Sequence, residues 1–176
     1  NILNACPELY ERTVVINGAA KSYCMTGWRI GYAACQPQIM MAMKKIQSQS
    51  TTCANSIAQH AAIAAFSAQK SDFVQPMLDA YQQRSQWLVQ AINRIEGLHA
   101  IPTHSTFYLF VAATQLIARL GLADDIALAN FLLDKAHVAT VPGSAFGSPN
   151  YLRFSYATSL EQIQTALDRI QQAVAS

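Results

Sequence analysis

The sequence predicts an α/β protein with two structural regions, and three observations indicate this. Short β-branched or alternating runs, typical of strands, are separated by longer stretches with helical periodicity. Consecutive predicted helices separate the first strands from the later ones, so the early strands form a region of their own, which we expect to be incomplete. Hydrophobic residues make up 52% of the 176 residues and charged residues 12%, which suits a chain with a sizeable core. We therefore predict two regions, residues 1–68 and residues 69–176.

The first region contains two predicted strands. Residues 13–16 are β-branched and are followed by Asn17-Gly18, which predicts a buried strand ending in a turn. Residues 29–35 predict the second strand. Two helices are predicted, at residues 38–47 and 56–67, with a polar loop at residues 48–55 between them. Pro37 opens the first helix, in the turn that proline favours.

The second region begins with the longest predicted helix. Its apolar stripe repeats at the helical period and consists of Val74, Leu78, Tyr81, Leu88, Ile92 and Ile95, with Gly97 as its end. Shorter elements follow, with strands predicted at residues 107–111, 138–141 and 151–156 and a helix at residues 124–136, for which Asp124 is the expected cap. The last helix carries Ile163, Leu167, Ile170 and Val174, and Ser159 begins a capping box at its start.

Charge, hydropathy and cysteine usage exclude several classes of function. A net charge of +2 with scattered basic residues argues against nucleic acid, and no apolar run approaches the roughly 20 residues of a membrane helix. The four cysteines, Cys6, Cys24, Cys35 and Cys53, form no close pair and have no histidine at metal-ligand spacing. We therefore expect reduced thiols, a cytoplasmic location and no bound metal. The absence of an initiator methionine before Asn1 indicates a fragment or a processed terminus.

Lys21 and Arg29 are the first candidates for chemistry. Lys21 lies just after a predicted strand, on a glycine-containing turn, and Arg29 opens the next strand. A partly desolvated lysine amine becomes nucleophilic toward a carbonyl, and a guanidinium matches a phosphate. This pair suits a phosphorylated aldehyde cofactor. On residue types alone, however, a solvated lysine and an arginine paired with a nearby carboxylate is the more frequent arrangement.

Residues 18–31 resemble the Schiff-base lysine signature of the class I/II, or fold-type I, pyridoxal-phosphate-dependent aminotransferases. In the bacterial aspartate and prephenate branch, the lysine is likewise followed by Met-Thr-Gly-Trp-Arg-Ile-Gly-Tyr; Cys24 stands where alanine is more usual. The resemblance implies that Lys21 forms the internal aldimine with pyridoxal 5′-phosphate. Lys21 would then shuttle a proton between the substrate α-carbon and cofactor C4′, while Arg29 would pair with the cofactor phosphate.

A second resemblance covers residues 141–147 and 152–158, which are similar to the family's turn and the strand that presents an arginine to the substrate α-carboxylate. Arg153 occupies that position, on the polar face of an alternating strand. From the residues alone, a structural ion pair at a sheet edge is an equal alternative. The sequence departs from the family at Ser105-Thr106, where a small pair such as Gly-Ala is usual, and at Pro149-Asn150, where glycine is more usual.

The resemblance covers only the latter part of the family's length. It implies the end of the large cofactor-binding domain followed by a small C-terminal domain with a mixed sheet and helices. The early strands would belong to a large parallel sheet, so residues 1–35 should need outside partners or pack poorly.

By this resemblance the protein is an amino-acid aminotransferase, of aspartate type, acting on small amino-acid and 2-oxo-acid substrates. Full-length members of the family are homodimers in which residues 49–52 tend to face the partner's active site, and we expect the chain alone to be inactive. The alternatives are a lyase or synthase of the same fold, and a non-catalytic domain that binds carboxylates or supports oligomerisation.

Overall fold

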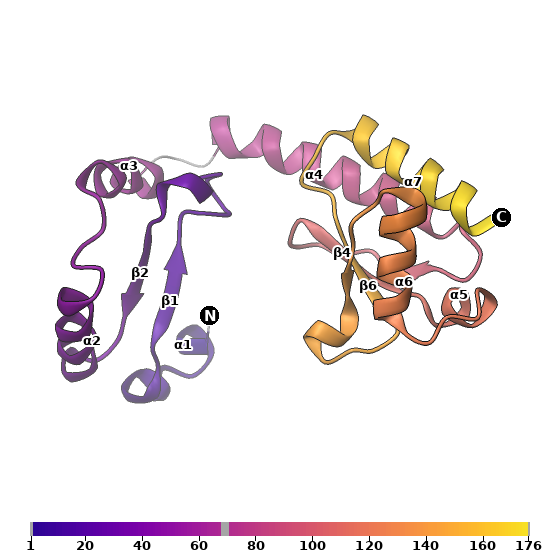
Figure 1. The fold of residues 1–176 in the computed structure, drawn as a ribbon. Coiled ribbons are helices and arrows are strands. Elements are labelled where there is room, and N and C mark those ends of the chain that lie inside the picture. The colour runs from indigo at the N-terminus through magenta and orange to yellow at the C-terminus, as the bar shows by residue number, and fades with distance from the viewer. Residues whose placement is uncertain (1, 68–70, 176) are drawn as a thin grey trace. The chain divides into compact units, whose positions relative to one another are not determined.

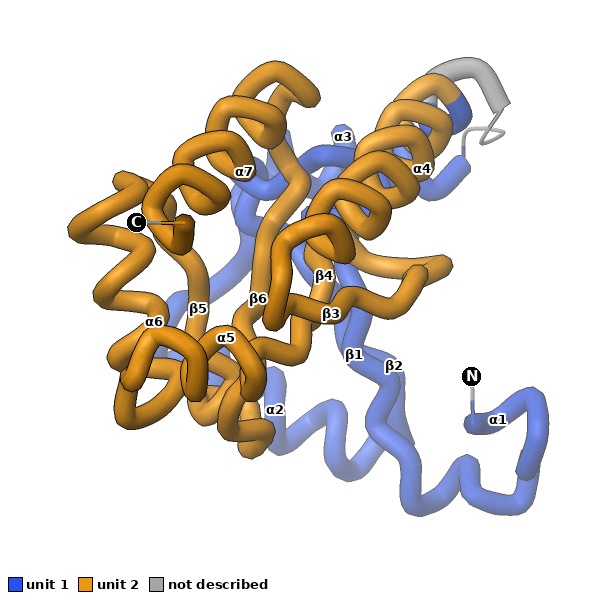
Figure 2. Tube along the Cα trace, turned by 90° about the vertical axis from the view of Figure 1, so that its right-hand side faces the viewer, with its two compact units in different colours: residues 1–75 blue, residues 76–176 orange. Residues whose placement is uncertain are grey.

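The computed structural model describes residues 2–67 and 71–175 (Figure 1). The chain forms two compact units, residues 1–75 and residues 76–176, which are described separately (Figure 2). The predicted boundary between residues 68 and 69 lies outside the described residues.

Unit 1 is built on one strand pair with short helices. Its helices and strands are α1 (Ile2–Ala5), a 3-10 turn (Pro7–Arg12), β1 (Val15–Gly18), a 3-10 turn (Thr26–Trp28), β2 (Gly31–Ala34), α2 (Pro37–Gln49) and α3 (Ser56–Ser67). The family resemblance implied that these strands belong to a large parallel sheet, but β1 and β2 pair antiparallel with each other, from Val15 opposite Ala34 to Gly18 opposite Gly31. The reason is the connection between them, which contains turns and no crossover helix of the kind that parallel neighbours need.

The side chains of unit 1 are poorly buried. Within residues 2–35, Ala19 and Met25 are the only buried side chains. The prediction of a buried first strand is therefore wrong for this chain, because Ile16 in β1 is 77% exposed and none of the four residues of β1 is buried. The poor packing predicted for residues 1–35 is confirmed for its described part. Apolar side chains on α2 and α3 are exposed as well, among them Met41, Ile46, Ile57, Ile63 and Phe66.

Unit 2 contains a four-stranded sheet and most of the long helix. Its elements are α4 (Ser71–Ile92, which begins in unit 1), β3 (His99–Ala100), β4 (Tyr108–Ala112), α5 (Thr114–Arg119), α6 (Asp125–Phe131) with a π-helical turn (Leu132–Ala136), β5 (Val141–Pro142), a 3-10 turn (Gly143–Phe146), β6 (Tyr151–Ser155) and α7 (Leu160–Ala175). The strand order is β3-β4-β6-β5. A mixed sheet was predicted; the three described pairings are all antiparallel.

One face of this sheet forms the core with the helices. Leu109 and Val111 of β4 and Leu152 and Phe154 of β6 are buried against α4, α5, α6 and α7 (Figure 1). The predicted stripe of the last helix is buried as expected. In α4 the stripe is buried toward its C-terminal end, whereas Leu78 is 49% exposed. The opposite face of the sheet carries the alternate side chains of the strands, among them Arg153.

Helix starts were predicted well, and short elements were not. The Asp124 side chain accepts a hydrogen bond from Ala127 N–H at 2.8 Å, and Ser159 accepts one from Gln162 N–H at 3.2 Å, which confirms both caps. The predicted strand at residues 138–141 is reduced to Val141–Pro142. The helix α5 and the strand β3 were missed, because elements this short show no clear period.

The long helix ends earlier than predicted. It stops at Ile92, before Gly97, and the next residue, Asn93, bonds β3 through its side chain. Asn93 Nδ2 donates to Ala100 O at 3.0 Å, and Ala100 N–H donates to Asn93 Oδ1 at 2.8 Å. These two bonds tie the residue after the helix to β3, a contact that no local sequence pattern predicts.

Candidate active site

The loop over residues 19–30 is closed at its base by two glycines. Gly18 and Gly31 face each other at the end of the β1–β2 pair. A Cβ at Gly18 would lie 3.1 Å from Ile30 O, and a Cβ at Gly31 would lie 3.1 Å from Asn17 O. Both distances are tight, so the absence of side chains lets the two ends of the loop approach.

Lys21 lies in the first turn of this loop, and its side chain is exposed. Tyr23 N–H donates to Ala19 O at 3.2 Å, and Cys24 N–H donates to Lys21 O at 3.3 Å. Cys24, the residue that departs from the common alanine, has a left-handed backbone with φ of 53°. The turn therefore holds the Lys21 backbone, and the residue is exposed in the described chain.

Arg29 ends the same loop, just before β2. Its backbone is left-handed, with φ of 51°, which is costly for a residue with a Cβ and is often seen at functional sites. The guanidinium is exposed, and Nη1 donates to Thr26 O at 3.0 Å. That bond uses one of the five N–H donors of an arginine. The structure thus places Lys21 and Arg29 on one loop between β1 and β2.

Arg153 belongs to unit 2 and has an aromatic setting that the sequence reasoning missed. Its Cζ lies 4.7 Å from the centroid of the Phe146 ring and 5.1 Å from that of the Tyr108 ring. The alternative of an ion pair at a sheet edge is not supported: β6 lies between β4 and β5, and within the described chain the one salt bridge joins Arg119 to Glu96. Aromatic contacts, rather than a carboxylate, hold this guanidinium.

More aromatic rings extend this face of the sheet. Phe110 stands opposite Arg153 in the register, and its ring stacks on Tyr151 with centroids 5.0 Å apart. Phe110 also meets Phe146 edge-on at 6.2 Å. The alternation of residues 108–112, with Leu109 and Val111 buried, was the signal that could have placed these rings beside Arg153.

Asp125 is a second residue that the sequence reasoning missed. It is 1% exposed, and its Oδ2 accepts a hydrogen bond from Ser144 N–H at 2.8 Å. Burial raises the pKa of its carboxyl, but hydrogen bonding, chiefly from the Ser144 N–H, outweighs burial, so the net pKa is below the usual range. Asp125 is therefore a buried, charged anchor for the loop that precedes β6.

Several known proteins similar to this chain are enzymes of one family. Residues 2–170 match the family described as aminotransferase class I and II. The chain belongs to this family. It is 51% identical over 176 residues to an aspartate/prephenate aminotransferase of Nitrosomonas europaea, covering 97% of this chain and 44% of that protein. It is 44% identical over 170 residues to an aspartate aminotransferase of Geobacillus stearothermophilus, covering 97% of this chain and 43% of that protein.

Solved structures agree with this assignment. The crystal structure of the aspartate aminotransferase from Rhizobium meliloti matches with a TM-score of 0.91 at 36% identity, covering 99% of this chain and 45% of that one. The predicted α/β fold class and the predicted family are thereby confirmed. The chain spans less than half the length of the aminotransferases it matches.

The two departures from the aminotransferase pattern have structural counterparts. Asn150 has a left-handed backbone with φ of 66°, a conformation that asparagine tolerates better than most residues and that explains why glycine is usual nearby. Thr106 has φ of 72°, which is unusual for a β-branched residue. The Thr106 hydroxyl donates to Tyr108 O at 3.0 Å, and the Tyr156 hydroxyl donates to Thr106 O at 3.2 Å. These bonds hold the strained residue next to the aromatic face.

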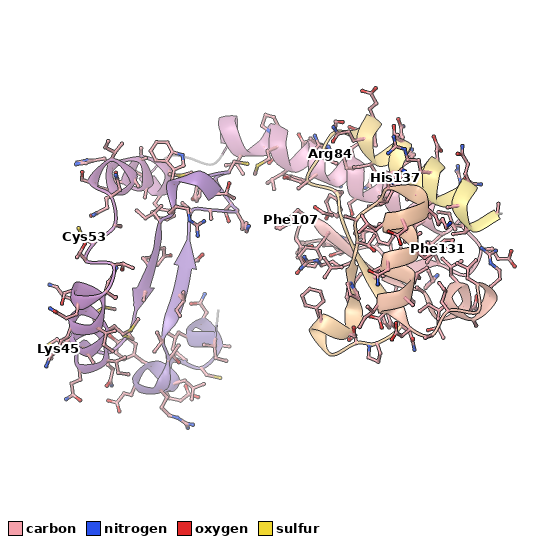
Figure 3. The ribbon with its side chains drawn as sticks, in the orientation of Figure 1. Lys45, Cys53, Arg84, Phe107, Phe131 and His137 are labelled. Atoms are coloured by element: carbon pink, nitrogen blue, oxygen red, sulfur yellow. The ribbon has the colours of Figure 1, made fainter. Side chains whose placement is uncertain are left out.

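Cysteines and histidines of this aminotransferase chain are dispersed. Cys53 lies in the loop between α2 and α3, and His137 follows the π-helical turn in unit 2 (Figure 3). The four cysteines, all within the described ranges, form no disulfide. In the same ranges no cluster of three or more metal-binding side chains is found, and no helix there combines the length and apolarity needed to cross a membrane.

Proposed function

We propose that the full protein transfers an amino group between an amino acid and a 2-oxo acid, with pyridoxal 5′-phosphate bound at Lys21. The observation that carries the proposal is the loop over residues 19–30, which presents an amine and a guanidinium together in a chain of the aminotransferase family. The names of the similar enzymes favour aspartate as the amino donor.

Lys21 and Arg29 are proposed to hold the cofactor. When bound, pyridoxal phosphate supplies a ring that withdraws electrons from the substrate α-carbon. Arg29 orients the phosphate with its planar fork of N–H donors. Lys21 holds the cofactor through its ε-amine and, once the substrate has taken its place, accepts the proton of the α-carbon and returns it.

Arg153 is proposed to bind the substrate α-carboxylate. Its contacts with Tyr108 and Phe146 are cation–π contacts, and none of its guanidinium N–H groups donates a hydrogen bond to another described residue. These N–H groups can donate to a carboxylate in the bidentate geometry that arginine favours. The aromatic contacts also restrict the side chain before substrate arrives, which lowers the entropy cost of binding.

Borohydride trapping tests the cofactor site. The full protein is mixed with pyridoxal phosphate, reduced, digested and analysed by mass spectrometry. We expect a pyridoxyl adduct on Lys21 that is lost in Lys21→Ala and retained in Lys45→Ala, which removes an exposed lysine of α2 (Figure 3). An adduct that forms equally in Lys21→Ala, or none at all, contradicts the proposal.

The proposal includes a homodimer in the cytoplasm. The exposed apolar side chains of α2 and α3 suit surfaces that the remainder of the protein or a second copy covers, and we propose that residues 49–52 face the partner's active site. Cysteines without disulfides are typical of a reducing compartment. Sedimentation of the full protein tests the dimer. We expect the 176-residue chain by itself to show no transaminase activity, and activity from it alone would be contrary to this.

A further inference from the structure

We propose that Asp125 is a positioning residue for Arg153: its carboxylate anchors the start of the loop over residues 143–150 through the Ser144 N–H and thereby places Phe146 against the guanidinium. The inference deepens the proposed function, on which it depends for the role of Arg153 toward the substrate.

The first step is the anchor made by the Asp125 carboxylate. It accepts a hydrogen bond at 2.8 Å from the N–H of Ser144, at the start of the loop and two residues before Phe146. A buried carboxylate is costly unless it is hydrogen-bonded, so this bond stabilises the carboxylate in its position. The start of α6 does not need Asp125 as a cap, because the neighbouring Asp124 already accepts the bond from Ala127 N–H.

The second step is the rigidity of the anchored loop. Ser148 N–H donates to Gly143 O at 3.1 Å, Gly147 N–H donates to Ser144 O at 3.1 Å, and Ala113 N–H donates to Asn150 O at 2.9 Å. A Cβ at Gly143 would lie only 2.4 Å from Ser148 O. The loop is therefore folded closely on itself and tied to the end of β4, so an anchor at its start also fixes the position of its middle.

The third step leads from the loop to Arg153. Phe146 lies in the middle of the loop and is 51% exposed, so burial alone does not fix its ring. Its ring nevertheless lies 4.7 Å from Arg153 Cζ and edge-on to Phe110. The backbone of the loop decides where this ring sits, and Asp125 holds that backbone.

A spectroscopic test uses the Arg153 side chain of the 176-residue chain. Two aromatic rings within about 6 Å of a guanidinium shift its NMR resonances by their ring currents. We expect Phe146→Ala and Asp125→Ala to move the Arg153 Nε–H resonance toward that of an exposed arginine, and Asp125→Asn to move it less. The matched control is Asp124→Ala, which removes the cap of the same helix and should lower the melting temperature while leaving Arg153 in place.

A kinetic test uses the full protein. We expect Asp125→Ala to raise KM for the amino-acid substrate by about three- to tenfold with little change in kcat, because misplacing Arg153 weakens binding in the ground state and the transition state alike. Arg153→Ala should raise KM by more, on the order of a hundredfold.

The outcomes separate the two proposals. If Arg153→Ala leaves KM unchanged, the carboxylate-binding role fails, and the NMR arm still decides whether Asp125 positions Arg153. If Phe146→Ala shifts the Arg153 resonance but Asp125→Ala and Asp125→Asn do not, the inference is overturned. Should Asp125→Ala fail to fold, Asp125→Asn, which weakens the bond from the Ser144 N–H, gives the same comparison.

Discussion

The two units of this chain differ in how much of their structure they stabilise by themselves. Unit 2 buries one face of its sheet under four helices, with Leu109, Val111 and Leu152 at most 1% exposed. Unit 1 leaves Ile16, at the centre of β1, 77% exposed. The residues proposed to hold the cofactor lie in the poorly covered unit, whereas the arginine proposed for the substrate lies on a sheet whose other face is a complete core. We infer that unit 2 supplies a rigid frame and that unit 1 depends on further protein.

The largest expected contrast compares one buried and one exposed strand residue. Leu152→Ala in β6 should cost about 3–4 kcal/mol of unfolding free energy, because it removes buried methyl groups and leaves a cavity. Ile16→Ala in β1 should change it by less than about 0.5 kcal/mol, because that side chain is already exposed. Chemical denaturation followed by circular dichroism measures both. Equal losses would falsify the contrast between the units.

Substituting one glycine in each unit tests the same difference between the units. Gly143→Ala in unit 2 should cost about 2–3 kcal/mol, since its Cβ would lie 2.4 Å from a backbone oxygen and 2.6 Å from Tyr151 Cβ. Gly27→Ala in unit 1 has nothing within 4 Å of the added atom and should be close to neutral. Thermal melts of both variants give the answer. A Gly143→Ala protein as stable as the original would mean that the loop over residues 143–150 is looser than its contacts indicate.

The pH dependence of unit 2 tests the charge on Asp125. Its folded pKa is lowered by hydrogen bonds, so its contribution to stability is complete above the unfolded pKa of about 3.9 and is lost as pH falls through the folded pKa. Asp125→Asn should cost about 1–2 kcal/mol at pH 7 and lessen the loss of stability on acidification. Urea denaturation between pH 3 and pH 7, with a probe in unit 2, measures this. A mutant with the full acid dependence of the original would show that another carboxylate is responsible.

The smallest expected effect concerns two threonine hydroxyls. Thr140 Oγ1 in unit 2 is buried and has no hydrogen-bond partner among the described residues, whereas Thr13 Oγ1 in unit 1 donates to Leu9 O at 2.8 Å. Thr140→Val should stabilise the protein by about 1 kcal/mol, and Thr13→Val should destabilise it by about as much. The two variants are expected to shift the melting temperature in opposite directions. Destabilisation by Thr140→Val would indicate that its hydroxyl has a partner after all.

Local patterns in the sequence predicted the elements with long periods or strong caps. The helix over residues 56–67 matches α3 in both bounds, and the alternation of residues 151–156 correctly predicts that Leu152 and Phe154 are buried. Asp124 and Ser159 were recognised because a cap acts within three residues of itself. Such features depend only on residues that are close together in the sequence, so they can be predicted from the sequence.

The sequence by itself determined the family of this protein, through the residues around Lys21 and the strand of Arg153, and it determined which side chains of the sheet face the core. Only the tertiary structure decided that β1 and β2 pair antiparallel, that Tyr108 and Phe146 flank Arg153, and that Asp125 anchors the loop before β6. These contacts join residues far apart in the chain. No local period or cap specifies them, because they depend on how the strands and loops meet in space.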